Sequence, residues 1–158
     1  MKRMIKSNSS AAKLNPLEKL TNEQEKLVEQ IERFVKKHLE NDNPAVFVLF
    51  GDAGTGKSYL LNHLFFRFQS KQRQEGDPLA GRHNYFLVNH PELLKVYRGI
   101  AGQYQQLLKK DFQRPTSFIN RSKKSGQKAD LVVIDEAHLL LSKPDPYNNF
   151  YGEDQLSE

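Results

Sequence analysis

The chain of 158 residues has no cysteine, which excludes a disulfide framework, a thiolate metal site and a cysteine nucleophile. It has no apolar run long enough for a membrane-spanning helix, and its mean hydropathy is −0.71. The first six residues are basic, but serine and asparagine at residues 7–10 stand where a secretory signal needs an apolar core. These absences predict a soluble, cytoplasmic protein with no membrane partner and no metal cluster.

Positive charge is concentrated in two segments, although the net charge is only +5. Residues 1–13 carry four basic residues and no acidic one, and we interpret residues 1–15 as a disordered basic tail. Residues 92–128 carry nine Lys and Arg against two acidic residues. Such a cluster is typical of solvated helix faces, and contact with a nucleic-acid backbone is the alternative interpretation. Residues 143–158 contain four acidic residues and two prolines, which predicts an irregular acidic C-terminus.

Apolar residues follow helix and strand patterns in alternation. A helical stripe extends from Thr21 to about Glu40, and Thr21 with Gln24 fits a capping box. Unbroken apolar runs suit strands buried on both faces, and they lie at 46–50, 85–88 and 131–134. Further helices are predicted at 58–68, 91–110 and 116–123, with a polar loop at 69–82. The alternation predicts an α/β fold with a mainly parallel sheet, in a domain over residues 16–142.

A glycine-rich segment between the first predicted strand and its helix matches the phosphate-loop pattern G-x-x-x-x-G-K-[ST] in full. Its glycines let backbone N–H groups surround a phosphate, and the next helix adds its positive N-terminal end. Lys57 would reach the β- and γ-phosphates, and the Ser58 hydroxyl would bind Mg²⁺. The alternative, an ordinary glycine-rich turn, fits the strand-to-helix position less well. The predicted nucleotide-binding residues are Gly51, Asp52, Ala53, Gly54, Thr55, Gly56, Lys57, Ser58 and Tyr59.

Two adjacent carboxylates end the last apolar run. Asp135 fits the Walker-B role of holding Mg²⁺, and Glu136 fits a general base that activates the attacking water. His138 follows as a candidate γ-phosphate sensor, or else as an ordinary surface histidine. The predicted catalytic residues are therefore Glu136, Lys57 and His138. The alternative for the acidic pair is a strand end that reaches solvent.

These motifs resemble those of superfamily 1-type helicases, and more specifically the Schlafen group 3-like DNA/RNA helicase domain of many bacterial proteins. The resemblance runs from about Leu20 to the C-terminus. The segments that carry it are Leu20–Gln24, Gly54–Ser58, Asn89–Glu92, Asp135–Leu141 and Tyr147–Phe150. It implies a P-loop NTPase with a RecA-like parallel sheet flanked by helices, which binds ATP and Mg²⁺. It also implies that Gln24 reads adenine, although the capping box is an equal use of that side chain.

The resemblance further implies a single-stranded DNA or RNA partner. The segment 115–119 is loosely similar to a threonine-containing motif that lies near bound single strands. The candidate contacts are Thr116, Arg121, Lys123, Lys124 and Lys128. Four aromatic residues among these basic ones can stack bases, but their helical spacing favours core packing. They are Tyr97, Tyr104, Phe112 and Phe118.

The family pattern continues beyond what this chain contains. The family has a further strand with a polar sensor motif, which lies between the phosphate-loop and motif II strands, and this chain lacks it. The family also has a second RecA-like half that supplies arginine fingers, and this chain lacks that half too. We therefore expect an incomplete domain with a gap in its sheet, the C-terminal half in a longer product, and weak ATP hydrolysis by this chain alone. Two other functions stay open: a P-loop ATPase switch for remodelling or signalling without a nucleic-acid substrate, and a non-catalytic truncated remnant.

Overall fold

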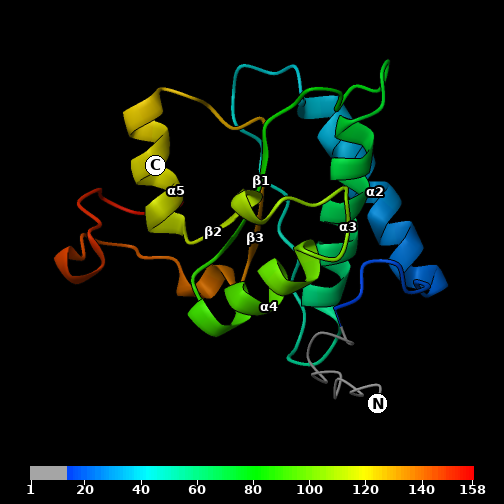
Figure 1. The fold of residues 1–158 in the computed structure, drawn as a ribbon, viewed down its shortest axis with the longest axis horizontal. Coiled ribbons are helices and arrows are strands. Elements are labelled where there is room, and N and C mark those ends of the chain that lie inside the picture. The colour runs from blue at the N-terminus through cyan, green and yellow to red at the C-terminus, as the bar shows by residue number, and fades with distance from the viewer. Residues whose placement is uncertain (1–13) are drawn as a thin grey trace, which may run out of the picture. The chain divides into compact units, whose positions relative to one another are not determined.

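The computed structural model describes residues 14–158 (Figure 1). They form two compact units, one that ends at residue 80 and one that begins at residue 81. The predicted basic tail lies outside the described residues, except for residues 14 and 15. Within the described part of the chain, no helix is long and apolar enough to cross a membrane. The first unit contains two long helices, and the second contains a three-stranded parallel sheet flanked by helices.

Helix α2 (Asn22–His38) begins where the capping-box pattern predicts. The backbone N–H of Gln24 donates to Thr21 Oγ1 at 3.2 Å, and the backbone N–H of Thr21 donates to Gln24 Oε1 at 2.9 Å. Two N–H groups that the helix itself leaves without partners are thereby satisfied. The capping box is confirmed.

Helix α3 (Lys57–Gln72) packs beside α2 and ends four residues beyond its predicted end. Apolar side chains of both helices are buried, among them Val28, Ile31, Val35, Leu64, Phe65 and Phe68. Arg67 donates to both carboxylate oxygens of Glu32, at 3.1 and 3.3 Å, and Lys71 donates to Glu32 at 2.9 Å. Because Lys71 lies in the last turn, this ion pair holds the helix end against α2, where the sequence predicted a loop.

The apolar run at residues 46–50 is not a strand, which corrects the sequence prediction. Val46, Val48 and Phe50 are 65%, 58% and 87% exposed, while the ring of Phe47 lies 5.5 Å from the ring of Phe34 on α2. A strand forms only where a neighbouring strand pairs its N–H and C=O groups. Among residues 14–158, no strand pairs with this run. Its apolar, β-favouring composition is therefore not enough to make it a strand.

The sheet of the second unit has β1 (Asn84–Val88) at its centre, between β2 (Phe112–Gln113) and β3 (Leu131–Asp135), and all pairs are parallel. Val88 pairs with Asp135, so β1 and β3 end at the same level. The predicted strands at 85–88 and 131–134 are confirmed. The unit also contains short 3₁₀ turns, which are η1 (Lys109–Asp111), η2 (Ala137–Leu139) and η3 (Pro146–Asn148).

Helix α4 (Pro91–Ala101) is nine residues shorter than predicted, because the chain turns back at Gly102. A Cβ atom at Gly102 would lie 2.8 Å from Cε of Lys109, so a larger residue there would displace the end of that lysine side chain. Arg98 then donates to the carbonyl oxygen of Phe112 from Nε at 3.0 Å and from Nη2 at 2.8 Å. This contact holds β2 beside α4.

Helix α5 (Pro115–Ser125) follows β2 and begins one residue before its predicted start. The core of this unit contains the fully buried rings of Phe86, Tyr97 and Phe112. The ring of Tyr97 lies 4.6 Å from that of Phe86 and 6.0 Å from that of Phe112. Core packing is therefore confirmed for Tyr97 and Phe112.

Candidate functional site

The phosphate-loop segment turns through two glycines in the left-handed region. Gly54 has φ +79° and Gly56 has φ +84°, conformations that other residues adopt only with strain. Gly56 is the N-cap of α3, and no side chain caps the helix there. The first N–H groups of α3 thus follow directly on the loop, in the arrangement that suits an anion.

The ammonium group of Lys57 lies within this loop. It donates to the carbonyl oxygen of Gly51 and, at 2.5 Å, to that of Asp52, and it lies 3.4 Å from Thr55 Oγ1. A Cβ at Gly51 would approach Thr55 Oγ1 to 3.0 Å and Lys57 Cδ to 3.4 Å. The loop is therefore closed tightly around one positive charge, and a larger residue at position 51 would press on the side chains of Thr55 and Lys57. The residues present fit a phosphate group.

Gln24 and Tyr59 lie next to the loop in the same unit. The Gln24 side chain uses Oε1 in the capping box, and its Nε2 lies 3.4 Å from the position that a Cβ at Gly56 would take. Tyr59, in the first turn of α3, donates its hydroxyl to the carbonyl oxygen of Glu18 at 2.7 Å. Burial, together with the negative charges of Glu18 and Glu25, raises the pKa of Tyr59.

In the second unit, Asp135 ends β3 with both carboxylate oxygens bonded. Oδ2 accepts from the hydroxyl of Tyr97 at 2.7 Å, and Oδ1 accepts from the backbone N–H of Glu136 at 2.9 Å. Asp135 is only 4% exposed, and Tyr97 is fully buried. The sequence did not reveal the Tyr97 bond, because a tyrosine at helical spacing has the same pattern as any core residue.

Glu136 has φ 53° and ψ 47°, the left-handed conformation, which costs a non-glycine residue about 1–3 kcal/mol. Its Oε2 lies 3.3 Å from Nδ1 of His138, whose side chain is 71% exposed. The N–H of Leu139 donates to the Glu136 carbonyl at 2.9 Å and closes the turn. The structure therefore brings Glu136 and His138 together at the surface, directly after the buried Asp135.

Asn89 links this turn to the rest of the sheet edge. Its Nδ2 donates to the carbonyl oxygen of Leu139 at 2.7 Å, and its Oδ1 accepts from Nη2 of Arg114 at 3.0 Å. Asn89, Arg114 and Asp135 lie at or just after the carboxyl ends of the three parallel strands, the edge at which such sheets bind ligands. Sequence reasoning noted the segment of Asn89 but assigned that side chain no role.

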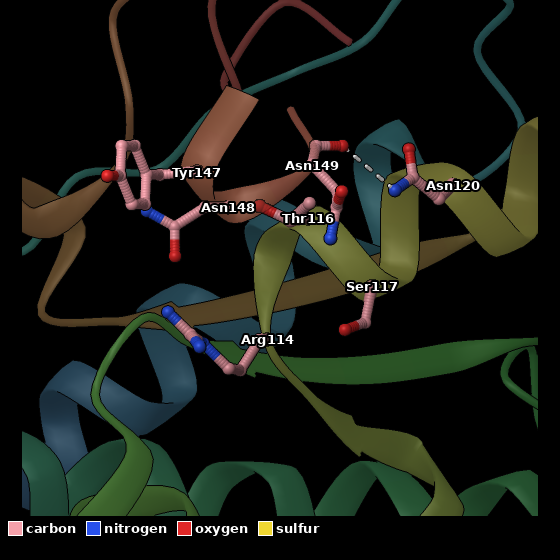
Figure 2. Close-up of a pocket in the computed structure, with 7 residues that line it drawn as sticks. All are labelled: Arg114, Thr116, Ser117, Asn120, Tyr147, Asn148 and Asn149. Atoms are coloured by element: carbon pink, nitrogen blue, oxygen red, sulfur yellow. Dashed lines mark hydrogen bonds between the residues drawn. The ribbon is translucent and has the colours of Figure 1, made fainter. Parts of the chain in front are cut away.

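A polar pocket of about 290 Å³ lies over the start of α5. Figure 2 shows its seven lining residues, which are Arg114, Thr116, Ser117, Asn120, Tyr147, Asn148 and Asn149. Asn120 Nδ2 donates to the carbonyl oxygen of Asn149 at 3.2 Å, which ties α5 to the turn after η3. Tyr147 is fully exposed. Of the lining residues, the sequence had predicted Thr116 alone, because contacts between such distant segments have no local pattern.

The predicted nucleic-acid contacts cluster on or just after α5. Thr116 lines the pocket, and its hydroxyl accepts from Gln155 Nε2 at 2.8 Å. Arg121, Lys124 and Lys128 are exposed. Lys123 forms an ion pair with Glu158, so its charge is partly compensated.

Oxygen donors are the groups available to a magnesium ion. Within the described residues, no cluster of three or more His, Asp or Glu side chains could hold a metal by itself. The hydroxyl of Ser58 and the carboxylate of Asp135 are hard oxygen donors, and Mg²⁺ prefers such donors while keeping several waters. Ser58 in the first unit and Asp135 in the second are therefore each, taken separately, donors of the kind that Mg²⁺ prefers.

Comparison with known proteins gives one family and one similar protein. The family described as "Schlafen group 3, DNA/RNA helicase domain" matches residues 44–158, well over half of the chain. The chain is 44% identical over 147 residues to the uncharacterized protein YPL245W of Saccharomyces cerevisiae. The match covers 88% of this chain and 32% of the yeast protein, so the chain spans about a third of that relative. No solved structure matches the chain.

Proposed function

Because the chain belongs to the Schlafen group 3 DNA/RNA helicase domain family, we propose that it binds ATP with Mg²⁺ as the nucleotide-binding part of a helicase-like ATPase. One observation carries the proposal. The loop of residues 51–58 has left-handed glycines at positions 54 and 56, encloses the Lys57 ammonium group, and leads directly into α3. An ordinary turn has no need to combine these three features.

Each loop residue has a distinct part in the proposed binding. The N–H groups of the loop and of the first turn of α3 would donate to phosphate oxygens. Lys57 would exchange the carbonyl oxygens of Gly51 and Asp52 for phosphate oxygens, which are stronger partners because they are charged. Gln24 would use Nε2, the end of its amide that faces the loop, to donate to adenine.

The acidic residues would act on the metal and on water. Ser58 and Asp135 would hold Mg²⁺, which neutralises phosphate charge when bound. Glu136 would orient the attacking water and take its proton, and the exposed His138 beside it would sense the γ-phosphate. We expect a turnover below about 1 s⁻¹ for this chain alone, since an arginine finger contributes about 10³–10⁵ in rate.

The polar pocket over α5 supports a nucleic-acid partner for this ATPase. Arg114 and the hydroxyls of Thr116 and Ser117 are suitable donors to a backbone phosphate, and the exposed Tyr147 offers a stacking face for a base. The exposed Arg121, Lys124 and Lys128, on or just after α5, would supply further contacts to backbone phosphates. We propose single-stranded DNA or RNA as the partner.

Thermal unfolding with and without MgATP tests the nucleotide proposal. ATP at 100 times its Kd should add about 2.7 kcal/mol, a rise in Tm of roughly 5–10 °C for a chain of this size. Lys57→Ala should lose most of that rise, because it removes the charge from the loop. Lys26→Ala, the same change at an exposed position on α2, should keep it.

A chain that melts cooperatively but gains nothing from MgATP would contradict the proposal. An equal gain in the parent and in Lys57→Ala would show that ATP binds elsewhere. A gain from MgATP without any binding of a single-stranded oligonucleotide would favour the P-loop switch over the helicase-like function.

A further inference from the structure

The hydroxyl of Tyr97 is a polar group within an otherwise apolar contact. Its ring packs against the rings of Phe86 of β1 and Phe112 of β2, which also contact each other, and this packing restricts where the hydroxyl points. That hydroxyl lies 2.7 Å from Asp135 Oδ2, and both residues are buried. Phenylalanine would fill the same space, so the hydroxyl is needed only for what it bonds.

The two bonds to Asp135 fix the orientation of its carboxylate. Tyr97 holds Oδ2, and the N–H of Glu136 holds Oδ1, so rotation of the group would break both bonds. A carboxylate has about four lone-pair positions, so each oxygen keeps one for a further partner. Mg²⁺ requires nearly ideal octahedral geometry, and it therefore depends on how its ligands are oriented. Hydrogen bonds that orient metal ligands commonly change metal affinity 10–100-fold.

We propose that Tyr97 is a positioning residue for the nucleotide-bound Mg²⁺, acting through Asp135 and touching neither the ion nor the nucleotide. The inference rests on the proposed function, and it adds a residue that no phosphate-loop or motif II pattern contains. It makes α4 part of the metal site, although α4 carries none of the predicted ligands. A purely structural role for the hydroxyl predicts lower stability without any change in the response to Mg²⁺.

The test is a Mg²⁺ titration of nucleotide binding by the full chain, followed with a fluorescent ATP analogue. Tyr97→Phe should need about 10–100-fold more free Mg²⁺ to reach half of the metal-dependent gain in affinity. In EDTA the variant should bind the analogue as the parent does, because the phosphate loop is unchanged. Tyr85→Phe removes the same atom from a half-buried ring on β1 that contacts Phe118, and it should leave the Mg²⁺ midpoint unchanged.

A double-mutant cycle ties the effect to Asp135. In an Asp135→Asn background, Tyr97→Phe should shift the midpoint no further, since the oriented carboxylate is already gone. A further shift of the same size there would overturn the inference. So would a folded Tyr97→Phe chain with the parent's midpoint.

Two further outcomes, an unfolded variant and a parent chain that does not respond to Mg²⁺, also have a definite meaning. If Tyr97→Phe does not melt cooperatively, the titration is repeated in sucrose, which favours burial and compact states. A variant that stays unfolded there would show the hydroxyl to be required for folding, and that would overturn the positioning role. A parent chain without Mg²⁺-dependent binding would overturn the proposed function itself, whereas a normal parent with a normal variant overturns only the role of Tyr97.

Discussion

His63 on α3 lies in surroundings that disfavour the protonated form of its imidazole. Burial and the neighbouring Arg67 lower its pKa below the ordinary value of 6.5, against smaller opposing effects from the Pro16 backbone, Glu25 and Glu32. The folded chain therefore binds fewer protons at His63 than the unfolded chain between the lowered pKa and 6.5. The free energy of unfolding should rise with pH across that window and gain nothing from His63 above it.

A comparison of Tm between about pH 5 and pH 7.5 tests this expectation. His63→Gln should show a flatter rise than the parent, since it removes the group that takes up protons on unfolding. His83→Gln, at an exposed position, should follow the parent. Equal slopes in the parent and His63→Gln would contradict the assignment.

At the scale of elements, the first turn of α2 has an observed capping role and a proposed role in nucleotide binding, which substitution can separate. Thr21→Ala removes the side chain that accepts from the N–H of Gln24, and it should cost about 1 kcal/mol of stability. Gln24→Glu keeps the acceptor for the N–H of Thr21, so stability should change little. It loses the amide donor beside Gly56 and adds negative charge near the loop, so ATP should bind more weakly.

Paired measurements of Tm and ATP affinity separate the two effects. Thr21→Ala should lower Tm and leave the ATP affinity of the folded chain unchanged. Gln24→Glu should leave Tm nearly unchanged and lower the ATP affinity. If Gln24→Glu binds ATP as the parent does, the side chain caps the helix and has no part in nucleotide binding.

The elements also show what the sequence can predict. Some predictions rest on local patterns, and each of these gave an element of the right type. They are the capping box of Thr21 with Gln24 and the apolar runs at 85–88 and 131–134. The run at 46–50 is at least as apolar as β1 and β3, but a strand also needs a neighbouring strand, which composition cannot supply. Helix α4 ends at Gly102, although apolar residues continue at helical spacing to Leu107, so the pattern alone does not show where the helix ends.

The candidate site also combines residues that contiguous motifs indicate with contacts that the sequence does not reveal. The phosphate loop and the Asp135–Glu136 pair are contiguous motifs, so their residues could be named in advance. The bond from Tyr97 to Asp135 spans 38 positions, and that from Asn89 to Leu139 spans 50. Bonds of this length depend on strand order and register, which no spacing in the sequence encodes.

At the scale of the whole molecule, the uneven charge predicts a salt-dependent interaction with nucleic acid. Each phosphate neutralised on a single strand contributes about −0.7 to the slope of log K against log salt concentration. Replacing the exposed Arg121, Lys124 and Lys128 by glutamine should therefore make the slope shallower by up to about 2. The same charge change at the exposed Lys26, Lys36 and Lys37 of α2 should leave it unchanged.

Titrations of a fluorescent single-stranded oligonucleotide at several salt concentrations measure both slopes. Equal slopes in the two triple variants would contradict a contact surface on α5. A strong loss of affinity without a change of slope would indicate that stacking, rather than charge, dominates there.

The run at residues 46–50 should give the chain an unusual order of hydrogen exchange. Its valines and phenylalanines have the composition of a protected core strand, yet among the described residues its backbone belongs to no ladder. Its amide protons should therefore be replaced by deuterium almost as fast as those of an unfolded peptide, while those of β1 exchange slowly. The most continuous apolar segment of the sequence would thus be among the first to take up label, and any partner that pairs with it would be detected as protection appearing at these five residues.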